Sequence, residues 1–261
     1  SKTLRETVLN LSGWRERGFY GRAHRAKHNI SAADLRQRLS ITLDHEVEVL
    51  EHQFARNNVA WATGTARFTD PNTIEVTHEG RIQRFVGDKF ILAVGTAPYR
   101  PPHIPFDGET ILDADEILEL KRLPRSLAVI GGSVIGIEYA TIFSALDVKV
   151  TVIDPADRVL PFVDRELVDE FVHDMRDRGM TLRFESKVKS AKRMGADACL
   201  IELEDGRQIW SEMILFAAGR KGAIDSLNLD ACGLAGDERG RIEVERTTFQ
   251  TKVPHIYAVG D

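Results

Sequence analysis

The segment from Leu127 to Ala140, LAVIGGSVIGIEYA, constrains the fold of this chain more than any other part of it. A short apolar run ends in two glycines, and an apolar helical pattern begins immediately after them. This order predicts a strand, a tight turn and a helix N-terminus, whose unpaired N–H groups and positive dipole end attract phosphate. Glycines let the backbone turn and approach a dinucleotide pyrophosphate closely. The segment therefore predicts a dinucleotide-binding turn.

The turn departs from the G-x-G-x-x-G fingerprint at one position. The fingerprint requires glycine at positions 131, 133 and 136, and position 133 is a serine. The side chain of Ser133 either donates its hydroxyl to a phosphate oxygen or crowds the ligand, and the sequence leaves both open. The predicted cofactor-binding residues of the turn are Gly131, Gly132, Ser133, Val134, Ile135 and Gly136.

An acidic residue follows the next predicted strand. The apolar, β-branched segment DVKVTVID ends at Asp154, which lies 18 residues after Gly136 (154 − 136). A dinucleotide-binding βαβ unit carries an acid about 20 residues after its last glycine, where it accepts hydrogen bonds from the adenosine ribose. The alternative is an ordinary strand-to-helix turn whose glycines serve close packing, with Asp154 a turn residue before Pro155.

The acid also bears on which nucleotide is bound. A carboxylate repels a 2′-phosphate and accepts from a 2′-hydroxyl, so Asp154 favours NAD(H) over NADP(H). Arg158 is the nearest basic residue and would accommodate NADP(H). Gly219 and Arg220 follow the predicted strand 213–217 and are expected near the nucleotide, at the edge of the sheet where such ligands bind. The alternative for these two residues is a turn glycine with a solvated arginine.

Composition excludes several classes of protein. The 261 residues carry a net charge of −5, which argues against general nucleic-acid binding. No apolar run approaches the roughly 18 residues of a membrane span, so we expect no membrane partner. Cys199 and Cys232 have no metal-binding or redox spacing, and we expect them to be reduced thiols of a cytoplasmic protein. His24 and His28 lie in a basic, loop-like stretch, and no metal site is predicted.

The remaining pattern predicts an α/β protein. A helix over 31–58 carries an apolar stripe that is expected to face a core; its members are Leu35, Leu39, Leu43, Val47 and Leu50. Short strands follow, including ones at 241–244 and 255–259. A proline-rich stretch over 98–105 is a natural place for the chain to cross between domains.

Four motifs, in order, resemble the FAD-dependent pyridine nucleotide-disulfide oxidoreductase family. Ser1-Lys2 looks like the end of the segment after the family's redox-cysteine motif, and AVGTAP (93–98) is similar to the family's first return from its FAD domain. The glycine turn with Asp154 resembles its NAD module. TKVPHIYAVGD (251–261) is similar to its second flavin motif. The resemblance covers the whole chain.

The resemblance implies a domain organisation and a flavin site. It predicts a Rossmann-like NAD-binding domain, a βαβ sheet plus a β-meander, inserted in a partial FAD-binding domain of the same type. The expected boundaries are 1–107 for the first FAD segment, 108–228 for the NAD(P) domain and 229–261 for the return segment. Gly95, Thr96 and Asp261 are implied to bind FAD.

The family also implies a catalytic pair. Its glutamate at the position of Glu138 pairs with a lysine at the position of Lys2, beside the flavin ring. A positive charge there stabilises reduced, anionic flavin. From position alone, Glu138 is an acid that the helix dipole favours in the first turn of its helix.

Among subfamilies, the soluble transhydrogenases fit best, because VIGIEYATIF with DVKV, and the residues after Arg220, look like theirs. The implied function is hydride transfer between NAD(P)H and flavin. The alternatives are a lipoamide dehydrogenase-like disulfide reductase and a catalytically inactive nucleotide-binding module. We expect the chain to be an internal fragment that does not retain FAD alone. The intact protein is expected to be a homodimer formed through a C-terminal domain outside this chain.

Overall fold

The computed structural model describes residues 2–14 and 30–261, so His24 and His28 lie outside the described residues. The chain forms two compact units. The first contains Ser1–Glu48 and Pro98–Gly219, and the second contains Val49–Ala97 and Arg220–Asp261. The chain thus enters the first unit within the predicted proline-rich stretch. The domain boundaries expected at 107/108 and 228/229 stay a prediction for the whole protein.

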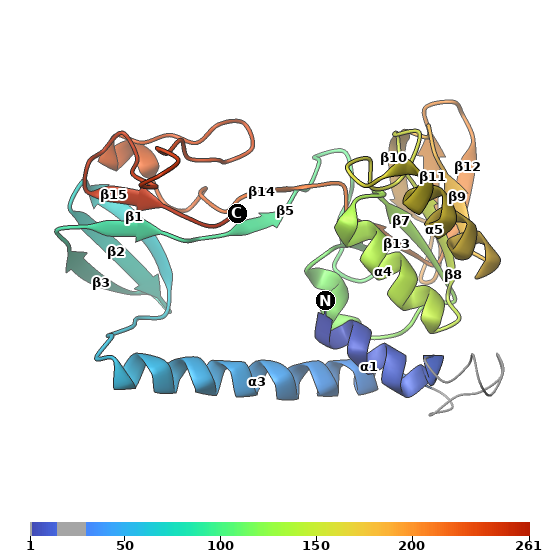
Figure 1. Cartoon of the computed structure of the whole chain (residues 1–261), viewed down its shortest axis with the longest axis horizontal. Coiled ribbons are helices and arrows are strands. Elements are labelled where there is room, and N and C mark those ends of the chain that lie inside the picture. Colours follow the sequence, from blue (N-terminus) through green and yellow to red (C-terminus); the bar gives the residue numbers. More distant parts are fainter. Residues whose placement is uncertain (1, 15–29) are drawn as a thin grey trace. The chain divides into compact units, whose positions relative to one another are not determined.

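A parallel sheet forms the centre of the first unit (Figure 1). Its strand order is β6 (Ile111–Asp113), β13 (Met213–Phe216), β7 (Ser126–Ile130), β8 (Lys149–Ile153) and β9 (Thr181–Arg183). All four neighbouring pairs are parallel. The short strands are almost continuously apolar, as expected where both faces of a parallel sheet are covered. This sheet contains the predicted βαβ unit.

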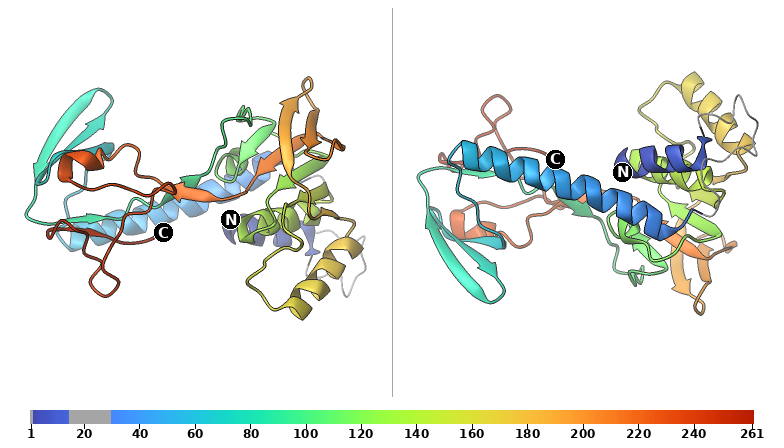
Figure 2. Two further views of the ribbon diagram at one scale, coloured as in Figure 1. Left: turned by 90° about the horizontal axis from the view of Figure 1, so that it is seen from above. Right: turned by 90° about the horizontal axis from the view of Figure 1, so that it is seen from below.

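Alternate side chains of the strands serve two different cores. Leu127 and Val129 of β7 pack on the side of α1 (Lys2–Ser12), α4 (Val134–Ala145) and α5 (Arg165–Asp177). Ala128 and Ile130 pack on the other side, against an antiparallel meander. Its strands are β10 (Val188–Arg193), β11 (Cys199–Leu203) and β12 (Gln208–Ser211). Figure 2 shows α5 and the β11–β12 hairpin on opposite sides of the sheet, and the predicted α/β fold with a β-meander is confirmed.

The long helix differs from its prediction in what it buries. It forms as α3 (Ala32–Arg56), with Ser31 accepting the N–H of Asp34 at its start. Of the predicted apolar stripe only Leu35 is buried, while Leu43 and Val47 are each 54% exposed. The prediction that the stripe faces a core is therefore wrong for most of its length in the described part of the chain. Periodicity predicts which side of a helix is apolar, but only a neighbouring segment can cover it.

The second unit combines an antiparallel sheet with two short strand pairs. The sheet contains β1 (Thr65–Asp70), β2 (Thr73–His78) and β3 (Arg81–Val86). The pairs are β4 (Phe90–Leu92) with β15 (Ile256–Ala258), which run parallel, and β5 (Thr96–Pro98) with β14 (Arg220–Gly222). A small core joins them, with Phe68, Leu92 and Ile256 among its members.

Two segments of the chain are less regular than the strands around them. The prediction of a strand at 241–244 is wrong, because Ile242 makes only an isolated bridge to Gly236. Short 3₁₀ turns, η2 (Glu116–Glu119) and η3 (Leu229–Cys232), connect strands in the first and second units respectively. The predicted strand at 255–259 forms as β15.

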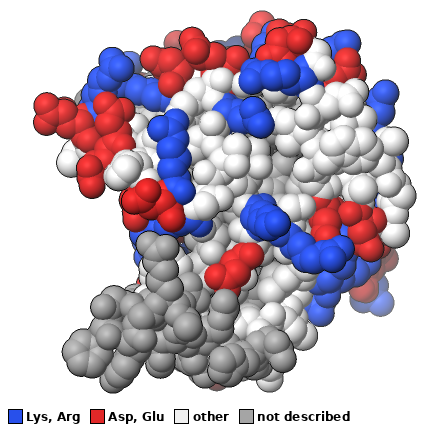
Figure 3. Space-filling model, turned by 90° about the vertical axis from the view of Figure 1, so that its right-hand side faces the viewer, with Lys and Arg blue, Asp and Glu red and all other residues white. Residues whose placement is uncertain are grey.

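Two further features of the described residues are the length of their helices and the distribution of charge on one face. None of the helices in residues 2–14 and 30–261 is both long and apolar enough to cross a membrane. On the face drawn in Figure 3, lysines and arginines alternate with acids around a band of uncharged residues.

Asp107 ties down the start of β6. Its carboxylate accepts the N–H groups of Thr110 at 2.7 Å and Ile111 at 2.9 Å, and the Thr110 hydroxyl at 2.6 Å. Burial opposes ionisation, but the Thr110 hydroxyl and the N–H groups of Ile111, Thr110 and Glu109 outweigh it, and the pKa of Asp107 falls from 3.8 to about 2. Because the folded pKa is lowered, the carboxylate stabilises the fold above pH 3.8, and this contribution is lost as the pH falls towards 2.

We predict that Asp107→Asn lowers the free energy of unfolding by about 1 kcal/mol near neutral pH, since solvent screens part of the charge contribution. The deficit should shrink as the pH falls towards about 2, because the wild-type carboxyl is then protonated as well. Denaturant unfolding at the two pH values measures it. Asp157→Asn, which removes an exposed carboxylate without a described partner, is the control. A deficit that does not change with pH would show that ionisation of Asp107 is irrelevant.

Candidate functional site

The glycine turn lies at the edge of the parallel sheet where several strands end. Strand β7 ends at Ile130 and α4 begins at Val134, so residues 131–133 form the whole connection. The N–H of Gly131 donates to the carbonyl of Ile153 at 2.9 Å, and the N–H of Ala217 donates to that of Ile130 at 2.8 Å. The ends of β8 and β13 therefore hold the turn from both sides. This is the edge at which parallel α/β sheets bind their ligands.

Two glycines of the turn are required by the space around them. Gly131 has φ +113°, and a Cβ there would lie 2.7 Å from the carbonyl oxygen of Ala217. A Cβ on Gly136 would lie 1.9 Å from the carbonyl oxygen of Gly131. Close packing thus explains these glycines, and the same packing brings the N-terminus of α4 onto the edge of the sheet.

Ser133 fits its position without strain. Its backbone is extended, with φ −80° and ψ −178°, a conformation open to any residue. It is the N-cap of α4, yet its exposed side chain makes no capping hydrogen bond. Serine in place of glycine therefore causes no backbone strain at this position. Serine at an N-cap normally bonds to the helix, so this hydroxyl is left available to a ligand.

Asp154 lies beside the turn, as the spacing predicts. It follows β8, and its carboxylate accepts the N–H of Gly132 through Oδ2 and the N–H of Ala156 at 2.7 Å through Oδ1. The side chain is partly buried. A carboxylate next to unpaired helix N–H groups is the arrangement that binds the ribose and pyrophosphate of a dinucleotide.

The loop after Asp154 also rests against the glycine turn. The N–H of Leu160 donates to the carbonyl of Gly132 at 3.3 Å. Arg158 directs its guanidinium to the carbonyl of Pro161 at 2.7 Å, so this cation is engaged by its own loop. Sequence reasoning missed Val159, which is fully buried and whose Cγ1 would lie 2.9 Å from a Cβ on Gly132. One apolar residue in a loop gives no signal by which it could have been found.

Gly219 and Arg220 are directed to different places. Gly131 approaches Ala217 and Ala218 closely, so the segment leading to Gly219 passes beside the glycine turn. Arg220 begins β14, and its guanidinium donates to Oγ1 of Thr96 at 2.8 Å and to the carbonyl of Thr96 at 2.6 Å. Arg220 reaches Thr96 because β14 pairs with β5. Thr96 is one of the residues expected to bind the flavin, so Arg220 lies beside the expected flavin site.

The second unit brings the expected flavin residues to one edge. Strands β4 and β15 are parallel neighbours, so the residues after their carboxyl ends lie together. Gly95 follows the first and Asp261 the second, and both line one pocket of about 290 Å³. Thr96 is next to Gly95 and is held by Arg220. Residues separated by more than half of the sequence thus meet within one unit.

The predicted catalytic pair is not formed in the described structure. Helix α1 packs against α4, but no hydrogen bond or ion pair joins Lys2 to Glu138 in residues 2–14 and 30–261. Lys2 is exposed at the start of α1, and Glu138 is partly buried in α4. The fold brings the two helices together, while the long lysine side chain remains in solvent.

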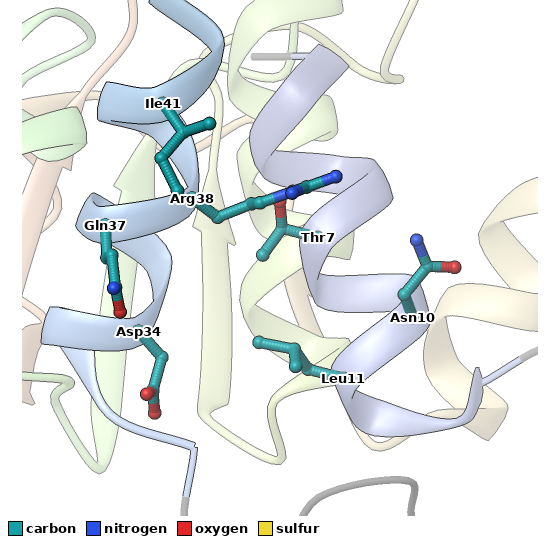
Figure 4. Close-up of a pocket in the computed structure, with 7 residues that line it drawn as sticks. All are labelled: Thr7, Asn10, Leu11, Asp34, Gln37, Arg38 and Ile41. Atoms are coloured by element: carbon teal, nitrogen blue, oxygen red, sulfur yellow. The ribbon is translucent and has the colours of Figure 1, made fainter.

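Another pocket, in the first unit, is lined by none of the predicted site residues. A pocket of about 440 Å³ lies between α1 and α3, and Figure 4 shows Arg38 reaching across it towards Thr7. Its lining mixes apolar and polar side chains without a cluster of like chemistry. Among the described residues, no three His, Cys, Asp or Glu side chains are placed to hold a metal ion.

Similarity of the sequence to known protein families defines the class of this protein. The family profile described as pyridine nucleotide-disulphide oxidoreductase matches residues 10–261. The chain belongs to this family, in agreement with the resemblance inferred from its motifs.

Within this family, the chain is similar in sequence to soluble pyridine nucleotide transhydrogenases. The soluble pyridine nucleotide transhydrogenase of Mycobacterium tuberculosis (strain ATCC 25177 / H37Ra) is 45% identical over 263 residues, and that of Vibrio vulnificus (strain YJ016) is 36% identical over 262. Each match covers 100% of this chain but 56% of the relative, so the chain spans little more than half the length of these proteins.

Solved structures support the fold. LpdA from Mycobacterium tuberculosis matches with a TM-score of 0.88 and 25% identity, over 100% of this chain and 57% of that one. The flavoprotein disulfide reductase RclA from Escherichia coli, as a mutant in a Cu(II) complex, matches with a TM-score of 0.85 and 22% identity, over 100% of this chain and 56% of the other. The latter likeness concerns the fold alone.

We predict that Gly136→Ala lowers the free energy of unfolding by about 2 kcal/mol or more and weakens nucleotide binding, because its Cβ collides with Gly131. Ser133→Gly is the matched control in the same turn, and it should change stability by only a few tenths of a kcal/mol. Denaturant unfolding and NADH titration of both variants measure the effects. Equal stability of Gly136→Ala and the wild type would contradict the packing described here.

Proposed function

We propose that the intact protein is an FAD-dependent oxidoreductase that transfers hydride between NAD(P)H and flavin, and that it is a soluble transhydrogenase. The observation that carries the proposal is the contact of Asp154 with the glycine turn at the edge of the parallel sheet. The 45% identity to a soluble transhydrogenase, over the whole of this chain, supports the choice within the family.

The residues at the sheet edge fit a dinucleotide. The first N–H groups of α4 have no acceptor within the helix, and the Ser133 hydroxyl does not cap it, so these donors would bind the pyrophosphate. Asp154 keeps lone pairs for the ribose hydroxyls. The segment leading to Gly219 passes beside the same turn, through Ala217 and Ala218. A bound nicotinamide nucleotide supplies the hydride, and the chain's part is to hold and orient it.

A flavin would be held by the second unit. Gly95 and Asp261 line one pocket after β4 and β15, and the hydrogen bonds from Arg220 fix Thr96, which follows Gly95 in the chain. Arg220 therefore acts in our proposal through the position of Thr96. A flavin held there would supply the acceptor and donor of hydride. Lys2 and Glu138 remain the proposed catalytic pair of the intact protein, which requires Lys2 to turn towards Glu138.

The other expected properties are proposals of the same kind. We place the intact protein in the cytoplasm as a homodimer, with nicotinamide dinucleotides as partners and neither a membrane nor nucleic acid among them. The disulfide reductase reading is kept as the second candidate, because a flavoprotein disulfide reductase has the same fold. A redox-cysteine pair preceding this segment in the intact protein would favour that candidate.

Titration of the 261-residue chain with NADH and NADPH tests the proposal. We expect saturable binding of NADH, and binding of NADPH about tenfold weaker, because Asp154 accepts from a 2′-hydroxyl and repels a 2′-phosphate. Dye reduction by NADH in the presence of added FAD is measured in parallel. Binding without turnover supports a nucleotide-binding module in the chain as it stands. Absence of NADH binding overturns the assignment of the glycine turn.

A second prediction concerns Arg158, whose guanidinium would leave Pro161 to meet a 2′-phosphate. We expect Arg158→Gln to weaken NADPH binding by several-fold, roughly the value of one exposed ion pair, and to leave NADH binding unchanged. Arg165→Gln, at the start of α5, is the control for general loss of positive charge. Equal weakening of both nucleotides by Arg158→Gln would show that Arg158 supports the loop rather than the choice of nucleotide.

A further inference from the structure

The carboxylate of Asp154 connects two segments before any ligand is present. Oδ2 accepts from the N–H of Gly132 in the turn, and Oδ1 accepts from the N–H of Ala156 in the following loop. Hydrogen bonds from a backbone N–H to a charged group are stronger than those between neutral groups. The side chain therefore joins the glycine turn to the loop that lies against it.

The backbone of Asp154 is itself fixed. Its N–H donates to the carbonyl of Arg183 at 3.0 Å, and its carbonyl accepts from the N–H of Ser186, also at 3.0 Å. Both partners lie at or after the end of β9. The carboxylate therefore starts from a position that the sheet determines. Because the backbone of Asp154 is held by these hydrogen bonds, its carboxylate can restrain the position of Gly132.

We propose that Asp154 is a positioning residue for the pyrophosphate turn, in addition to its contact with the ribose. By holding the N–H of Gly132, the carboxylate keeps the turn in the conformation that leaves the next N–H groups, at the start of α4, unpaired. A carboxylate has about four acceptor sites, so two bonds to the backbone leave room for ribose hydroxyls. This inference rests on the proposed nucleotide site.

An amide cannot replace the carboxylate in this role. Asparagine offers one acceptor oxygen, and its NH₂ group would face the N–H of either Gly132 or Ala156. One buried donor would then lose its acceptor, and the turn or the loop would shift. Asp154→Asn should therefore weaken binding at the pyrophosphate, at a distance from the ribose itself.

A cycle of two protein variants and two ligands separates positioning from ribose contact. The ligands are NADH and an NADH analogue whose adenosine carries no 2′- or 3′-hydroxyl. The variants are Asp154→Asn and, as the matched control, Asp157→Asn, which removes a charge from the same loop without a described bond. Affinities are measured by calorimetry on the full 261-residue chain.

We expect Asp154→Asn to bind the dideoxy analogue about tenfold more weakly than the wild type does, while Asp157→Asn binds it as the wild type does. If Asp154 acted through the ribose alone, its replacement would not affect the analogue. Equal or tighter binding of the analogue by Asp154→Asn overturns the inference while the nucleotide site stands. Failure of the wild type to bind NADH overturns the proposed function instead.

A measurement without ligand completes the test. The amide hydrogen of Gly132 should exchange with solvent about tenfold faster in Asp154→Asn than in Asp157→Asn, because it loses its acceptor. Unchanged exchange overturns the inference. If Asp154→Asn does not fold, Asp154→Glu takes its place, since it keeps the charge but displaces it by one methylene. Wild-type binding of the analogue and wild-type exchange in Asp154→Glu would overturn the inference equally.

Discussion

Parallel pairing of β7 with β8 and β13 is the constraint on which the first unit depends. Because the three strands run in the same direction and in register, the residues after their carboxyl ends meet at one edge. Gly131, Asp154 and Ala217 come from distant parts of the sequence, yet backbone hydrogen bonds join their neighbourhoods directly. The apolar, β-branched strands supply the burial that holds this register, with one core on each face. The chemistry of the site follows from that edge.

The same physical rule applies to the second unit on a smaller scale. Strands β4 and β15 are three residues each and run parallel, and the residues that follow them line a common pocket. The residues that line this pocket come from both parts of the second unit's sequence, before and after the segment Pro98–Gly219 of the first unit. Each unit thus places a candidate cofactor site at the carboxyl ends of parallel strands. A chain that folds back in this way can bring two nucleotide sites into one protein.

Local sequence is enough to predict the glycine turn, Asp154 and the strands that lead to them. Their signals are short-range, since a strand, a turn residue and a helix start within a few positions of one another. Gly95 and Asp261 were reached by resemblance, because nothing local in either motif indicates that the two would share a pocket. The contact of Arg220 with Thr96 has no signal in the local sequence, since it depends on the pairing of β14 with β5. Long-range pairing of such short strands carries no local pattern.

The apolar stripe of α3 and the pair of Lys2 and Glu138 are predictions from the sequence whose expected contacts are not formed in the described structure. The stripe is present in the sequence, but burial of Leu43 requires a covering segment, and none lies against it in the described residues. Lys2 and Glu138 sit on helices that pack together, but packing of backbones does not bring a flexible ammonium to a carboxylate. Asp154 differs from both, since the groups that it binds are backbone N–H groups whose positions the sheet already determines. A side chain whose partners are fixed by the fold is the kind of functional residue that sequence spacing predicts best. The departure at Ser133 leaves the turn intact for a separate reason, since the backbone of Ser133 is extended and any residue can adopt that conformation.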